Sequence, residues 1–148
     1  MAGHLNLAFF IAGLLLATPA LLGLPRFARP GLAHEAALAA ATATAVLGVT
    51  CISSLVMGHD GVWFNVIAPL TNAAWLFGSI ALAVSLKRAG HVPTAVAVGL
   101  PVAWIGTIPL ATLGGGLITG AYFLMVGSML TSDRIQDATQ PVAEAAVA

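Results

Sequence analysis

The chain has 148 residues, of which 59% are hydrophobic and only 7% are charged, and its five basic residues balance five acidic ones. A mean hydropathy of +1.01 is too high for a soluble domain, which would expose far too much apolar surface to water. The zero net charge gives no electrostatic reason to expect nucleic acid as a partner. The composition therefore predicts an all-α integral membrane protein whose surroundings are the lipid bilayer.

The first apolar run, residues 5–24, carries no ionisable side chain. A bilayer core about 30 Å thick needs roughly 17–25 apolar residues per helical span, and this run meets that length. No Lys or Arg precedes it, as a cleaved signal peptide would require, so we expect a retained first span. It should end before Pro25, because a proline disfavours helical geometry in the residue that precedes it.

Two further spans follow, over residues 35–57 and 64–86, separated by the polar turn Gly58-His59-Asp60-Gly61. The second span is rich in alanine and contains several Thr and Ser residues, so it is better suited to the interior of a bundle than to a lipid-facing position. The third span stops at Lys87-Arg88-Ala89-Gly90-His91-Val92-Pro93, where charge, glycine and proline all interrupt the helix.

The last apolar block, Thr94–Leu130, would form a helix about 55 Å long, which exceeds even a strongly tilted span. We expect a break at Gly114-Gly115-Gly116, giving a fourth span over 94–113 and a fifth over 116–131. A break at Pro109 would leave the fourth span too short. The alternative is four spans with residues 117–130 re-entrant or interfacial. Residues 133–148 are expected to form a disordered cytoplasmic tail.

The charges set the expected orientation, because nearly all of them lie at the ends of apolar runs. With five spans, every basic residue falls on one side of the membrane: Arg26, Arg29, Lys87, Arg88 and Arg134. Basic loops stay in the cytoplasm. The protein is therefore expected to be a multi-pass protein of the cell membrane with its N-terminus outside and its C-terminus in the cytoplasm.

Glycines recur at heptad spacing in the last two expected spans, at Gly99, Gly106, Gly120 and Gly127. Small residues let helix backbones approach closely in a membrane, so helix packing within one bundle or a homodimer is the main interpretation. A substrate path lined by glycine backbone is the alternative.

A second pattern is polar. Asn65, Asn72 and Ser79 are spaced by seven residues and share one face of the third span, while Thr50 and Ser54 of the second span could meet them. Polar groups at this depth need polar partners. Hydrogen bonds between helices are the first interpretation, and a path for a small neutral solute lined by these five residues is the second.

No pattern indicates catalysis. The chain contains no nucleophile elbow, phosphate loop, zinc-protease helix or paired carboxylates. Its histidines have no zinc-like spacing, and no two of them share a helical face within a span. We therefore expect no enzyme activity, no cofactor and no metal.

The stretch from Leu86 to Pro93 is followed by two apolar segments that glycines separate. It resembles the loop with arginine, glycine and proline that occurs in uncharacterised small multi-pass membrane proteins of actinobacterial type. Ala12-Gly13-Leu14-Leu15-Leu16, with Leu24-Pro25-Arg26, is similar to their first span. The resemblance implies a bacterial inner-membrane protein of this topology, and it implies no activity.

Two functions fit these observations. The first is a non-enzymatic accessory subunit or scaffold that binds a larger membrane-protein partner. The second is a homodimeric transporter or channel for a small neutral solute.

Overall fold

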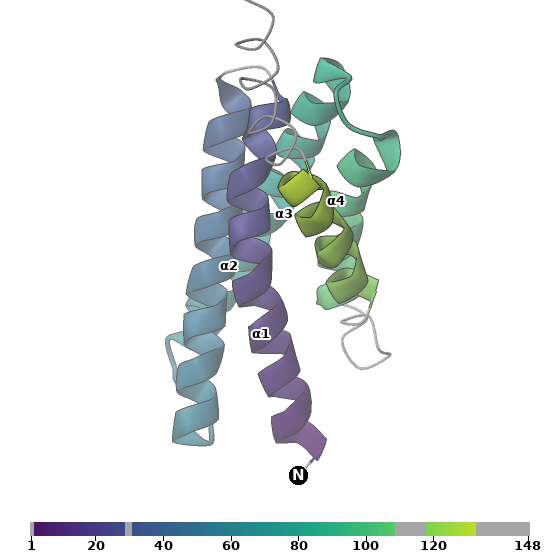
Figure 1. The fold of residues 1–148 in the computed structure, drawn as a ribbon. Coiled ribbons are helices and arrows are strands. Elements are labelled where there is room, and N and C mark those ends of the chain that lie inside the picture. Colours follow the sequence, from purple (N-terminus) through teal and green to yellow (C-terminus); the bar gives the residue numbers. More distant parts are fainter. Residues whose placement is uncertain (1, 29–30, 109–117, 133–148) are drawn as a thin grey trace, which may run out of the picture.

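The structure is a computed structural model that describes residues 2–28, 31–108 and 118–132 (Figure 1). Every regular element in these ranges is helical, and no strand occurs in them, which confirms the expected all-α bundle. The elements are α1 (Ala2–Gly23), the 3-10 turn η1 (Leu24–Phe27), α2 (Leu32–Met57), α3 (Phe64–Ala89), α4 (Thr94–Thr107) and a final helix over Ile118–Ser132.

Three segments are long and apolar enough to cross a membrane: Phe10–Phe27, Leu32–Met57 and Phe64–Ala89. With 26 residues each, α2 and α3 are about 39 Å long, which exceeds a bilayer core of about 30 Å. Helix α4 has 14 residues and is about 21 Å long, and the Ile118–Ser132 helix is similarly short. The expected break at 114–116 lies outside the described residues.

Glycine and proline direct the reversals of the chain. Gly58 caps the C-terminus of α2 and Gly90 caps that of α3, with φ of 73° and 75°, which are left-handed values that glycine adopts without steric cost. At the end of α1 the chain tightens into η1, where Pro25 lies in the first turn. Because each turn reverses the chain, α1, α2, α3 and α4 alternate in direction along the bundle (Figure 1).

Helix α2 packs against both α1 and α3, and it is the most buried of the three candidate membrane spans. Twelve of its 26 residues are buried, against seven of the 26 residues of α3. A Cβ atom built on Gly78 of α3 would lie 2.9 Å from the Ala36 carbonyl oxygen and 3.0 Å from the Ala40 Cβ. The two backbones therefore approach as closely as small residues allow, which is how helices gain dispersion contacts in a membrane.

Larger side chains make up the rest of the buried core. Trp75 of α3 is the largest fully buried side chain in the described part of the chain, with an exposed fraction of 1%. The largest fully buried aliphatic side chains of the described residues come from α1, η1, α3, α4 and the Ile118–Ser132 helix, namely Leu14, Leu21, Leu24, Leu82, Leu86, Leu100 and Val126. On the other side of α2, Gly48 lies against Leu14 and Leu15 of α1.

One end of the bundle carries most of the described charge. Arg26 donates a hydrogen bond to the Leu130 carbonyl, and its guanidinium carbon lies 4.8 Å from the centre of the Phe27 ring. The His91 Nδ1 atom is 3.2 Å from the Phe27 carbonyl oxygen, which brings η1 beside the turn between α3 and α4. Lys87 and Arg88 therefore lie at the same end as Arg26, while the turn between α2 and α3, which contains Asp60 and Trp63, lies at the opposite end (Figure 1).

Candidate functional site

The five polar residues expected to form a solute path lie in different surroundings. Asn65 is exposed in the first turn of α3, Asn72 is half-buried, and Ser79, Thr50 and Ser54 are buried. The Thr50 hydroxyl donates to the Leu47 carbonyl of its own helix over 2.7 Å. Within the described ranges, the hydroxyl groups of Ser54 and Ser79 are buried without a hydrogen-bond partner.

Asn72 links two helices. Its amide nitrogen donates to the Ala68 carbonyl over 2.7 Å, and its amide oxygen accepts a hydrogen bond of 3.3 Å from the indole nitrogen of Trp104 in α4. Both ends of the side chain are therefore used to join α3 to α4. The sequence did not identify Trp104 as the partner, although a deep indole N–H needs an acceptor.

We expect the Asn72 and Trp104 side chains to be energetically coupled by about 1 kcal/mol, the usual size for a hydrogen bond between membrane helices. A double-mutant cycle with Asn72→Ala and Trp104→Phe, followed by unfolding in mixed micelles, measures this coupling. The matched control combines Asn72→Ala with Trp63→Phe, which lies just before the first residue of α3. In this pair the two losses of stability should add. Additive effects in the first cycle would contradict the hydrogen bond.

The glycines expected in helix packing also differ from one another. A Cβ atom on Gly99 would collide with the ring of Tyr122, whose hydroxyl donates to the Val96 carbonyl over 2.7 Å. Gly106 is buried. A Cβ atom on Gly120 or Gly127 would meet no atom of the described residues within 4 Å.

A small cluster of hydroxyl groups supports the contact that Gly99 makes between α4 and the Ile118–Ser132 helix. The Thr107 hydroxyl donates to the Thr119 hydroxyl over 3.0 Å, and Thr119 donates to the Ala103 carbonyl over 3.1 Å. Together with Tyr122, these bonds join the two short helices into a pair.

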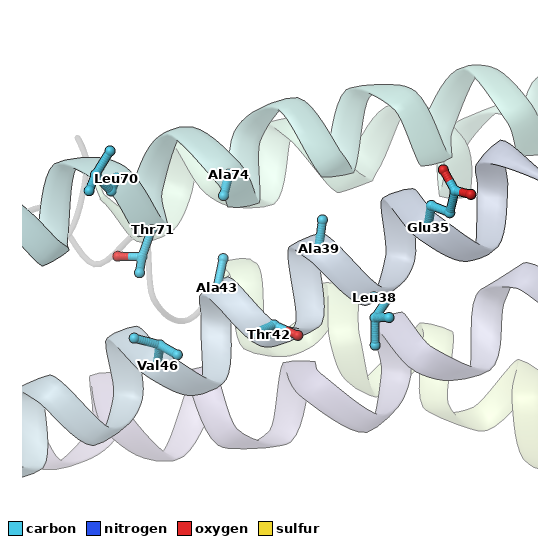
Figure 2. Close-up of a pocket in the computed structure, with 9 residues that line it drawn as sticks. All are labelled: Glu35, Leu38, Ala39, Thr42, Ala43, Val46, Leu70, Thr71 and Ala74. Carbon is cyan, nitrogen blue, oxygen red and sulfur yellow. The ribbon is translucent and has the colours of Figure 1, made fainter.

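A groove of about 530 Å³ runs along α2 and α3 on the outer surface of the bundle (Figure 2). The nine residues that line it are Glu35, Leu38, Ala39, Thr42, Ala43, Val46, Leu70, Thr71 and Ala74. In Figure 2 the side chains of Ala39, Ala43 and Ala74 point into the space between the two helices. None of the five expected solute-path residues lines this groove, so the residues predicted from sequence and the groove are separate features.

The groove itself was not predicted, although part of its pattern is present in the sequence. Glu35, Ala39, Thr42 and Val46 are spaced by four, three and four residues, which places them on one face of a helix. All four are exposed. An alternating three and four spacing of this kind is typical of a helix that packs lengthwise against another helix.

In the ranges that the structure describes, no three His, Cys, Asp or Glu side chains lie close enough together to hold a metal ion. His59 and Asp60 lie at one end of the bundle, and His34, Glu35 and His91 lie at the other.

Comparison of the chain with protein-family models, with curated protein sequences and with solved structures finds no match. The fold defines a helical bundle with three candidate transmembrane helices.

Proposed function

We propose that the protein is a small multi-pass membrane protein that acts as a non-enzymatic accessory subunit or scaffold for a larger membrane-protein partner. It crosses the membrane five times, with the N-terminus outside and the C-terminus in the cytoplasm. In this topology α4 and the Ile118–Ser132 helix form the last two spans. A bilayer that thins locally accommodates short spans at a modest cost.

The distribution of charge supports this orientation. Arg26, Lys87 and Arg88 lie at one end of the bundle, and the described residues place no Lys or Arg at the other end. Basic residues are retained on the cytoplasmic side of a membrane. Trp63, 38% exposed, lies at the opposite end, where an aromatic side chain suits the outer membrane interface.

The use of the polar side chains supports a subunit role. In the described part of the chain, the polar groups that bond between helices hold the bundle together, as Asn72 does with Trp104 and Thr107 with Thr119. The concave surface formed by α2 and α3 is apolar over most of its lining and opens outward. An outward apolar groove suits contact with another molecule in the membrane better than passage of a polar solute through the bundle.

A homodimeric transporter or channel for a small neutral solute is the second candidate. The buried hydroxyls of Ser54 and Ser79, which have no partner in the described ranges, favour it. The separation of the five path residues from the groove counts against it.

Affinity purification of the tagged protein from its native membranes in a mild detergent tests the proposal. We expect a larger membrane protein to co-elute in a fixed stoichiometry, identified by mass spectrometry. A tagged membrane protein of similar size and expression serves as the control for nonspecific capture. If the chain elutes alone as a homodimer, the subunit function is wrong, and solute uptake with Asn72→Leu becomes the next measurement.

A further inference from the structure

The groove along α2 and α3 has small residues at its base and branched residues around it. Ala39, Ala43 and Ala74 point into the space between the helices, while Leu38 and Leu70 lie at its edges (Figure 2). Small side chains at the base allow another backbone to approach closely, and branched side chains fit between the side chains of an arriving helix. The shape therefore suits a helix that lies lengthwise in the groove.

The Thr42 hydroxyl lies on this surface without a hydrogen-bond partner among the described residues. Thr18, Thr44 and Thr71, which also lie inside helices, each donate to the carbonyl four residues earlier. Thr42 is exposed and makes no such bond among the described residues. A hydrocarbon chain offers no hydrogen-bond partner, so an open hydroxyl facing lipid is costly. A polar group on a docked helix would satisfy it.

Glu35 marks the end of the groove nearest the basic end of the bundle. Its side chain is exposed, and its carboxylate extends from α2 toward α3 (Figure 2). In the described part of the chain no basic side chain forms an ion pair with it. Arg26, at the same end, is instead bonded to the Leu130 carbonyl. The open carboxylate is complementary to a cation on whatever fills the groove.

Two other occupants fit this surface less well. A symmetric dimer formed through the exposed face of α2 would bring two Glu35 carboxylates toward each other, and like charges oppose such an approach. A lipid chain would fill the apolar part of the groove but would leave the Thr42 hydroxyl without a partner.

We propose that the α2–α3 groove is the docking surface for one transmembrane helix of the partner, and that a Lys or Arg on that helix pairs with Glu35 at the cytoplasmic membrane surface. This inference rests on the proposed subunit function and names the chemistry of the partner.

Photo-crosslinking in native membranes tests the location of the interface. A diazirine-bearing aliphatic residue, similar in size to the natural one, replaces Val46 or Leu70 at the groove. The control positions are Leu22 on α1 and Val102 on α4, both of which are exposed. We expect an adduct with the co-purifying partner from the groove positions and none from the controls, with the attachment site inside an apolar helix that carries Lys or Arg near one end.

Charge substitution tests the pairing. Glu35→Gln should lower the amount of co-purified partner by about tenfold or more, because it leaves the partner's cation unpaired. Asp60→Asn, at the opposite end of the bundle, is the matched control and should change nothing. Glu35→Lys should also lose the partner, and reversing the partner's basic residue to Glu should restore it.

The outcomes separate this inference from the subunit function. A stoichiometric partner that crosslinks equally from the control positions, or that is retained by Glu35→Lys, overturns the groove assignment and leaves the subunit function standing. Adducts only with lipid or only with a second copy also overturn the groove assignment. Elution of the chain alone overturns the subunit function itself.

Discussion

Replacing Gly78 with leucine is expected to lower the free energy of unfolding by about 3 kcal/mol, at the upper end of the usual cost of overpacking. Even a Cβ atom at this position would lie 2.9 Å from the Ala36 carbonyl oxygen and 3.0 Å from both the backbone nitrogen and the Cβ of Ala40. These are mainly backbone atoms of α2, so a change of side-chain rotamer cannot relieve the contact. The helices must separate and lose their dispersion contacts along the interface.

Unfolding in mixed micelles, followed by the loss of far-ultraviolet helical signal, measures this change. Gly13 is the matched control, because it is also a glycine inside a helix but has no described atom within 4 Å of an added Cβ. Gly13→Ala should be neutral or should stabilise the protein by up to about 1 kcal/mol, since alanine favours helix more than glycine does. A Gly78→Leu protein as stable as the wild type would mean that α2 and α3 do not meet at this point.

The Trp75→Ala substitution is expected to lower the free energy of unfolding by about 3–5 kcal/mol, the usual range for removing a large aromatic side chain from a packed core. Trp75 is 1% exposed and has the largest fully buried side chain in the described ranges. Its indole nitrogen is buried there without a hydrogen-bond partner. Trp75→Phe should therefore cost less, because it removes a donor that is already unsatisfied and keeps much of the apolar area.

The same micelle unfolding experiment compares these variants. Trp63→Ala, at the exposed turn before α3, is the control and should cost less than about 1 kcal/mol. Equal losses for Trp75→Phe and Trp75→Ala would show that the indole nitrogen has a partner after all, and a small loss for Trp75→Ala would contradict its position in the core.

The helical architecture could be predicted from the sequence because hydrophobicity and chain-breaking residues are local signals. The third span was expected over 64–86, and α3 covers Phe64–Ala89. The helix continues through Lys87 and Arg88 because positive charge is favourable at a helix C-terminus, and Gly90 caps it. The fourth span was expected over 94–113, and α4 is described as far as Thr107, with residues 109–113 outside the described ranges.

The contacts between helices could not be predicted, because they depend on which helices are neighbours. Asn72 and Trp104 lie on different helices, and nothing local to either residue identifies the other. The alanines of α2 give a similar example. Ala37 and Ala41 are buried while Ala39 is exposed, yet all three carry the same side chain, and a methyl group does not indicate whether it faces protein or lipid.

The difference in length between the helices has a consequence for biosynthesis. The three segments that are long and apolar enough to cross a membrane all leave the ribosome before α4 and the Ile118–Ser132 helix. The two later helices are short. Each is hydrogen-bonded to an earlier element, α4 to Asn72 of α3 and the Ile118–Ser132 helix to Arg26 of η1. Synthesis from the N-terminus therefore delivers the three long apolar segments first, and the contacts of Asn72 and Arg26 with the two shorter helices can form only after those helices have been made.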